Sequence, residues 1–177
     1  RMWKGLFAGL VEAPGATAGV YDYLANEVFE GLPAHQQEFL MSTSILEVMS
    51  PPLCDRLLQR SDSAAVLEEL EERSLFTTRV ERGDQVWYRY HRLFREFLLA
   101  RMRQRSAGRE IALHIQAARH LEEESETAEA IRHFLSAGSY SDAARVIVQT
   151  AGATYDAGRL DTLHAWINAL PEPMLMD

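Results

Sequence analysis

Lysine and cysteine are nearly absent from this chain of 177 residues. Its 18 basic residues include a single lysine, and its formal net charge is -8. Scattered arginines favour bidentate ion pairs over the lysine-rich surface that binds polyanions, so nothing here indicates a nucleic-acid-binding face. The one cysteine, Cys54, excludes an internal disulfide. No apolar run approaches the roughly 18 residues that span a bilayer, so we expect a cytoplasmic protein that does not enter a membrane.

Motifs that hold a nucleotide, a metal ion or a nucleophile are also missing. The glycine pairs Gly5 with Gly9 and Gly15 with Gly19 lack the lysine and the spacing of a phosphate-binding loop. The six histidines are dispersed in the sequence, with no i, i+4 pair and no accompanying cysteine pair, so we expect no metal site. Cys54 is predicted to be a small buried hydrophobic side chain. The chain is therefore not expected to be an enzyme.

The chain is long and apolar enough, at 47% hydrophobic residues, to bury a core in one domain or two small ones. It starts at Arg1 and not at a methionine, and we expect a piece of a longer protein. Proline, glycine and small residues at 12–19 are typical of a linker. We predict a remnant of a preceding helix with its linker at residues 1–19, a first domain at residues 20–107, and a helical segment at residues 108–177.

Helical periodicity runs through most of the first domain. Ser50 stands just before Pro51, and a hydroxyl followed by proline predicts a capped first helical turn. Asp62 or Ser63 is expected to cap the next helix. Helices are predicted over residues 20–32 and 34–46 and after Pro51 and Asp62, the last with Val66, Leu67 and Leu70 facing the core.

The periodicity becomes alternating after residue 75. The inward positions are expected to be Phe76, Thr78 and Val80 in one strand and Val86, Tyr88 and Tyr90 in the next. Gly83 between them can adopt a positive φ, so a β-hairpin is predicted. A helix is predicted at residues 93–105, with Phe94, Phe97, Leu98 and Met102 on its apolar face. Helices followed by a hairpin and a closing helix predict a winged-helix domain.

Residues after 108 show helical periodicity only and are rich in alanine. Gly138, Gly152 and Gly158 are expected to separate four helices, over residues 111–124, 128–136, 141–151 and 160–170. Small residues permit the close crossings of stacked helical hairpins. The predicted fold class is therefore mainly α: a winged-helix domain with one β-hairpin, followed by the first TPR-like helical-repeat hairpins of an α-solenoid.

One run of residues carries a family resemblance. Residues 87–98 read WYRYHRLFREFL. They resemble the signature W-Y-R-Y-H-x-L-F-x-x-F-L that closes the winged-helix domain in large ATP-dependent LuxR-type transcription activators, the MalT class of signal-transduction ATPases. Weaker similarity continues upstream at residues 23–28 and 53–55 and downstream at residues 129–133 and 163–171.

The resemblance implies a role within a larger regulator. The winged helix is expected to pack on the protein's own nucleotide-binding domain, which binds ATP or ADP and hydrolyses ATP slowly. An unidentified small-molecule or protein inducer is expected to bind the helical arm, and DNA is expected to be read by a C-terminal domain outside this chain. The chain would then couple nucleotide state and inducer sensing to activation of DNA binding.

The resemblance also implies a role for His91. Its imidazole is expected to contact the β-phosphate of ADP in the resting state, and Arg89 and Arg92 lie close enough in sequence to support that contact. The alternative for His91 is a histidine that is hydrogen-bonded into the domain edge. The alternative for the two arginines is surface ion pairing with Glu96 or Asp84.

Two other functions stay open on the residues alone. The first is a helical-repeat interaction scaffold without a nucleotide switch. The second is a winged helix that binds DNA directly. The helix expected in the recognition position carries Glu68, Glu69, Glu71 and Glu72 beside Arg73. Carboxylates are repelled by DNA phosphates, which argues against the second function.

Overall fold

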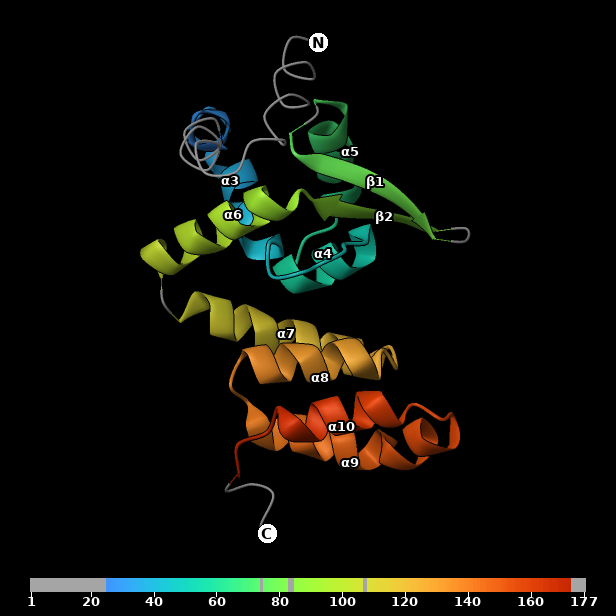
Figure 1. The fold of residues 1–177 in the computed structure, drawn as a ribbon. Helices are drawn as coiled ribbons and strands as arrows, with labels where there is room; N and C mark the ends of the chain where they lie inside the picture. The colour runs from blue at the N-terminus through green and yellow to red at the C-terminus, as the bar shows by residue number, and fades with distance from the viewer. Residues whose placement is uncertain (1–24, 74, 83–84, 107, 173–177) are drawn as a thin grey trace, which may run out of the picture. The chain divides into compact units, whose positions relative to one another are not determined.

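The computed structural model describes residues 25–73, 75–82, 85–106 and 108–172 (Figure 1). The chain forms two compact units, Arg1–Ser106 and Ala107–Asp177, and each is described by itself. The predicted remnant and linker at residues 1–19 lie outside the described residues, as does the start of the helix predicted from residue 20. The division predicted after residue 107 falls one residue from the division between the units.

Helix boundaries in the first unit follow its turn residues. Residues 25–30 form the described part of a helix that stops before Gly31. Helix α3 (Ala34–Thr43) ends before the predicted residue 46. The Ser44 amide and hydroxyl both donate to the carbonyl of Met41, at 3.3 and 2.6 Å, and this tight last turn ends the helix.

The next two helices are capped in different ways. Helix α4 (Pro51–Leu58) begins as predicted, since the Ser50 hydroxyl accepts a hydrogen bond from the Leu53 amide at 3.4 Å. Helix α5 (Ser63–Glu72) has no cap from Asp62, whose carboxylate pairs with Arg60 instead. Its cap is Asp55, which accepts from the Ser63 amide at 3.0 Å. Asp62 therefore holds the predicted N-cap position, but the predicted side-chain hydrogen bond is absent because its carboxylate pairs with Arg60.

The predicted hairpin forms from β1 (Thr77–Arg82) and β2 (Gln85–Tyr90), which pair antiparallel with Thr77 opposite Tyr90. The predicted inward face of β1 is wrong by one residue. Thr77 is buried and Thr78 is exposed, because Phe76 lies before the strand with a positive φ of 53°. This turn stacks the Phe76 ring on Phe94, with centroids 4.6 Å apart.

Helix α6 (Arg92–Arg105) closes the winged helix. Phe94, Leu98 and Met102 are buried and Phe97 is half-buried, so the predicted apolar face is confirmed. A third short pairing supports the hairpin, because Met49 and Tyr88 exchange two backbone hydrogen bonds of 2.7 Å. The core of the unit is thus enclosed by α3, α4, α5, α6 and the hairpin.

A buried polar link joins α3 to the hairpin. The hydroxyls of Thr43 and Tyr90 lie 2.7 Å apart. Thr43 already donates its only proton to the carbonyl of Phe39 at 2.8 Å, so Tyr90 is the donor in this bond. Burial raises the pKa of the Tyr90 phenol well above its usual value, which keeps the donating proton in place.

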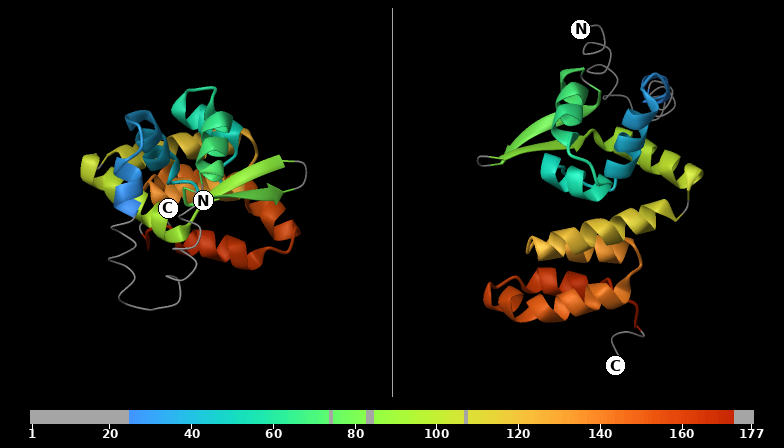
Figure 2. Two further views of the ribbon diagram at one scale, coloured as in Figure 1. Left: turned by 90° about the horizontal axis from the view of Figure 1, so that it is seen from above. Right: turned by 180° about the vertical axis from the view of Figure 1, so that it is seen from behind.

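The second unit consists of α7 (Arg109–Glu123), α8 (Thr127–Ser136), α9 (Tyr140–Asp156) and α10 (Leu160–Asn168), each packed on the next (Figure 2). Gly138 and Gly158 end helices as predicted, with positive φ values of 69° and 71°. Gly152 does not, because α9 continues through it to Asp156. A glycine costs a packed helix only about 1 kcal/mol, which neighbouring contacts offset.

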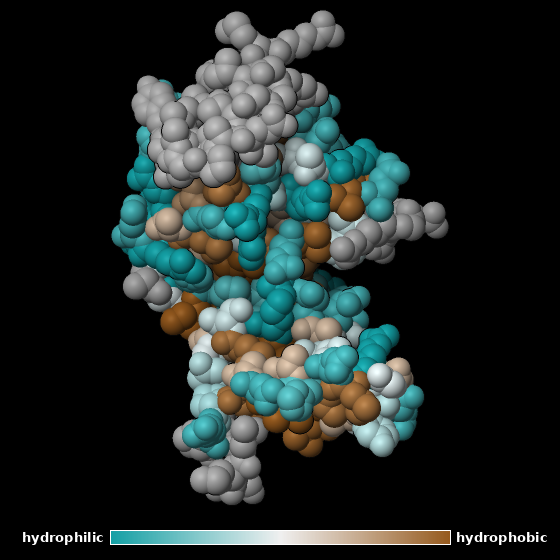
Figure 3. Space-filling model, viewed as in Figure 1, coloured by the Kyte–Doolittle hydropathy of each residue, from teal (hydrophilic) through white to brown (hydrophobic). Residues whose placement is uncertain are grey.

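One core runs through all four helices of the second unit. Its buried members are Ala118, Ile131, Phe134, Ala143, Val146, Ile147 and Leu170. Trp166 of α10 packs against this core and is half-buried. The large apolar side chains left exposed on α9 and α10 include Val148, Tyr155, Leu160 and Ile167, and Figure 3 shows apolar surface over these helices.

These two units confirm the predicted fold class. It is mainly α, with a winged helix that contains one two-stranded hairpin, followed by helical hairpins. Whether the helical hairpins continue as TPR-like repeats stays a prediction.

Replacing Tyr90 with phenylalanine is expected to lower the free energy of unfolding of the winged-helix unit by about 1 kcal/mol, because Thr43 loses a buried donor. Urea denaturation followed by circular dichroism measures this change. Tyr155→Phe is the matched control, since Tyr155 is 63% exposed. Equal stabilities of the two variants would show that the buried hydroxyl pair contributes nothing.

Candidate functional site

His91 lies at the junction where β2 ends and α6 begins. Its backbone is held on both sides: its amide donates to the Phe76 carbonyl at 2.7 Å, and its carbonyl accepts from the Arg95 amide at 3.0 Å. Its side chain is exposed and does not cap α6. The backbone therefore fixes where an exposed imidazole is presented.

The two arginines of the predicted site flank His91 in sequence and are both exposed. Arg89 lies on the outward face of β2, where its carbonyl accepts from the Thr78 hydroxyl at 3.3 Å. Arg92 starts α6, with its side chain 82% exposed and 3.7 Å from Glu96. The expected pairing of Arg92 with Glu96 is present, whereas Asp84 lies outside the described residues. Such an exposed pair contributes little to stability and leaves both groups accessible.

The start of α6 favours anions. No acidic residue lies in its first turn, and the first amides of a helix carry a partial positive charge. Arg92 adds a full positive charge at the same end. Imidazole rings, guanidinium groups and helix N-termini are each groups that can bind a phosphate oxygen.

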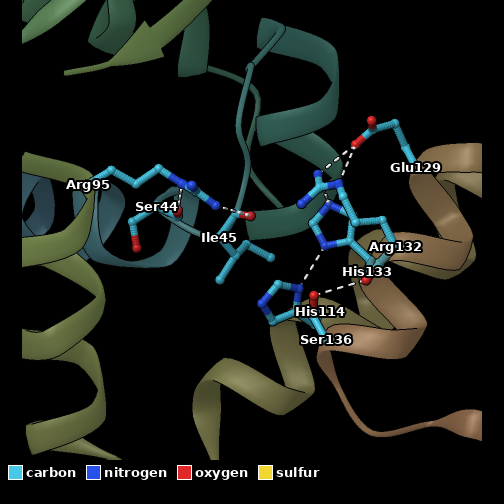
Figure 4. Close-up of polar contacts among 8 residues, drawn as sticks. All are labelled: Ser44, Ile45, Arg95, His114, Glu129, Arg132, His133 and Ser136. Carbon is cyan, nitrogen blue, oxygen red and sulfur yellow. Dashed lines mark hydrogen bonds and ion pairs between the residues drawn. The ribbon is translucent and has the colours of Figure 1, made fainter. Parts of the chain in front are cut away.

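Arg95 anchors this junction and was missed by the sequence reasoning. Its Nε donates to the carbonyl of Ser44 at 2.8 Å and its Nη2 to that of Ile45 at 3.4 Å (Figure 4). These carbonyls follow the end of α3, so Arg95 ties that end to the first turn of α6. The available signal was that no carboxylate lies three or four residues from Arg95, which leaves the half-buried guanidinium to find backbone acceptors.

The third helix of the winged-helix domain, α5, presents carboxylates to solvent. Glu68, Glu71 and Glu72 are exposed. Glu69 accepts from the side-chain amide of Gln36 at 2.9 Å and from Arg73 at 3.0 Å, and these two hydrogen bonds lower its pKa. The helix in the recognition position is thus negatively charged at neutral pH, which opposes contact with phosphates.

Two of the six histidines meet in the fold. His114 of α7 and His133 of α8 are buried, and their Nδ1 atoms lie 2.7 Å apart (Figure 4). The two residues are far apart in sequence, so an i, i+4 search could not find them. Across the described ranges, no group of three or more histidine, cysteine or acidic side chains could hold a metal ion.

Other sequence predictions concern Cys54 and the membrane. Cys54 is fully buried, so the prediction of a small buried side chain is confirmed, and burial raises the pKa of its thiol. Within the part of the chain that the structure describes, each helix is too short or too polar to cross a bilayer.

Comparison with known proteins places this geometry in a family. Residues 25–110, which include the hairpin and α6, match the family model described as the MalT winged helix domain. The chain is MalT-like. The HTH-type transcriptional regulator MalT of Vibrio cholerae is 34% identical over 89% of this chain and 17% of its own length. The MalT regulator of Klebsiella pneumoniae is 30% identical over 88% of this chain and 17% of its own length.

The serine/threonine-protein kinase PknK of Mycobacterium tuberculosis is also similar, at 30% identity over 92% of this MalT-like chain and 14% of the kinase. The chain therefore spans less than a fifth of the length of these curated relatives. Its residues 25–110 form a winged-helix domain of the MalT type.

Replacing Arg95 with methionine should lower the free energy of unfolding of the winged-helix unit by roughly 1 to 3 kcal/mol, since two carbonyls lose a charged donor. Arg92→Met, a change of the same chemistry three residues earlier on the same helix, should cost less than about 0.5 kcal/mol. Thermal denaturation of both variants measures the difference. A cost for Arg92→Met as large as that for Arg95→Met would contradict the anchoring role.

Proposed function

We propose that this chain is the regulatory part of a larger MalT-like, LuxR-type transcription regulator, in which it couples nucleotide state and inducer sensing to DNA binding. In the resting state the winged helix packs on the protein's own nucleotide-binding domain, which holds ADP. An inducer bound to the helical arm, together with ATP, releases this packing. DNA is then bound through a domain outside this chain.

The observation that carries the proposal is the presentation of His91. A histidine imidazole can donate a hydrogen bond to a phosphate oxygen, and it does so more strongly when the phosphate is charged. Exposed Arg89 and Arg92, two residues before and one residue after His91, and the start of α6 add positive charge close to it in the chain. Because the backbone of His91 is fixed to Phe76, a contact with phosphate would hold the whole domain in place.

The relatives differ in their named activities, and this supports a regulatory role for the shared region over a role in DNA binding or catalysis. The same region recurs in proteins named as transcriptional regulators and in one named as a protein kinase. Outputs that differ so much cannot both reside in the shared region. A switch that controls either output is the simpler common function, and it also accounts for an exposed histidine better than an inert scaffold does.

His91→Ala in the full-length regulator tests the switch. Loss of one hydrogen bond to a charged group costs about 1.5 to 3 kcal/mol, which moves a two-state equilibrium about tenfold to a hundredfold toward the open form. We expect weaker ADP binding and higher reporter transcription without inducer. Calorimetry and a promoter fusion measure these two effects.

The control for that experiment is His35→Ala, because His35 is exposed on α3 and outside the proposed site. It should leave ADP affinity and basal transcription unchanged. If His91→Ala folds normally and behaves like His35→Ala in both assays, His91 is structural and the nucleotide switch does not act through it.

The 177-residue chain alone should show no sequence-specific DNA binding at physiological salt, because α5 is acidic and the net charge is -8. An electrophoretic mobility shift assay across a salt series checks this expectation. A specific shift that is lost when Arg73 is replaced would support the alternative, a winged helix that reads DNA itself.

A further inference from the structure

His114 and His133, here called the histidine pair, join α7 to α8 inside the helical unit. Their side chains are 6% and 1% exposed, and their Nδ1 atoms lie 2.7 Å apart. The two rings are tilted by 46°. At this distance one Nδ1 must carry a proton and the other must offer its lone pair.

Arg132 decides which histidine donates. Its Nη2 lies 3.2 Å from Nε2 of His133, and a guanidinium can only donate. Nε2 of His133 is therefore an acceptor, so the ring proton of His133 is on Nδ1 and is donated to His114. Nδ1 of His114 is then the acceptor, and its ring proton is on Nε2. Glu129 fixes Arg132 in this position through contacts of 3.0 and 2.5 Å (Figure 4).

This arrangement has no place for an additional proton. A second proton on His133 would have to bind Nε2, which faces Arg132. A second proton on His114 would have to bind Nδ1, which already receives the proton of His133. In either case two N–H groups would point at each other inside the α7 and α8 contact, which opposes protonation while the helices stay packed.

The charged groups on the surrounding helices do not remove this conflict. The acidic, basic and histidine side chains besides the pair are Arg109, Glu110, Arg119, His120, Glu122 and Glu123 on α7, Glu129 and Arg132 on α8, and Asp142, Arg145 and Asp156 on α9. Glu110 lies one turn before His114 and would attract a proton. That proton would still have to bind the occupied Nδ1. The buried side chains that α9 contributes to the core are the apolar Ala143, Val146 and Ile147, which cannot accept a proton.

We propose that the histidine pair makes the packing of α7 on α8 sensitive to protons, so that mild acid opens this helical hairpin. The pair is stable as two neutral rings of opposite tautomer, and the hairpin must separate before either ring accepts a second proton. This property belongs to the helical unit and does not require the nucleotide switch.

The size of the effect follows from proton counting. In the unfolded chain a histidine takes up a proton near pH 6.5, whereas the packed pair takes up none. The open form thus binds more protons in acid, and stability is lost as the pH falls. Between pH 7.5 and 5.5, each excluded proton raises the ratio of open to closed hairpin about tenfold, so the pair raises it about a hundredfold.

The first test reads the tautomers directly in the 177-residue chain. Long-range proton–nitrogen NMR spectra at pH 7.5 should show His133 protonated on Nδ1 and His114 on Nε2. As the pH is lowered, both rings of the pair should stay neutral until the hairpin signals are lost. The reverse tautomers, or either ring gaining a proton with the hairpin intact, would overturn the proposal.

The second test compares variants by urea unfolding of the helical unit, followed through its amide NMR signals at pH 7.5 and 5.5. The wild type and His164→Gln should show the hundredfold change. Arg132→Met should show about tenfold, because the pair can then share one extra proton. His114→Leu with His133→Leu should show almost none.

The variant series separates the outcomes. A wild-type change no larger than that of the double leucine variant means that the pair is not the proton sensor. If the hundredfold change persists in Arg132→Met, Arg132 does not contribute to the proton sensitivity of the histidine pair. Should the double variant fail to fold, the tautomer and titration measurements on the wild type still decide the proposal.

Discussion

The hydrogen bond of 2.7 Å from the His91 amide to the Phe76 carbonyl sets the geometry of the winged helix. It fixes the point at which β2 stops following β1 and α6 begins. Because no loop intervenes, Tyr90 is buried on one side of this point and Phe94 on the other. One turn into α6, Arg95 reaches the backbone after α3. A few consecutive residues thus position the β1–β2 hairpin, α6 and α3 relative to one another. The same constraint places the exposed imidazole of His91 at the domain edge.

Local chemistry made part of this fold predictable, and contacts between distant residues made the rest unpredictable. Ser50 before a proline and Gly158 after a helix act on their own neighbours, so their effects could be read from the sequence. Gly152 has the same local signal as Gly158 but sits in a helix that packs on others, and packing overrides it. Asp55 caps the helix at Ser63, eight residues further along the chain, which no local pattern reports.

In the candidate site too, features set by neighbouring residues could be predicted, and features set by distant residues could not. His91 and Arg92 were found because a contiguous run of residues carries the family signature, and contiguity is what sequence comparison detects. Arg95 belongs to the same run, yet its backbone acceptors lie about fifty residues away. His114 and His133 come from two helices, so only the packing of α7 on α8 brings them together. Interactions that depend on helix packing therefore carry the parts of the chemistry that spacing could not reveal.

Cys54 gives the winged-helix unit a chemical reporter of its own. Its side chain is 0% exposed, and burial raises the pKa of the thiol. Alkylating reagents attack the thiolate, so the folded unit protects this sulfur both sterically and by keeping it protonated. The sequence contains no other cysteine. The rate of alkylation therefore measures how often the interior beside α4 opens, without any engineered label.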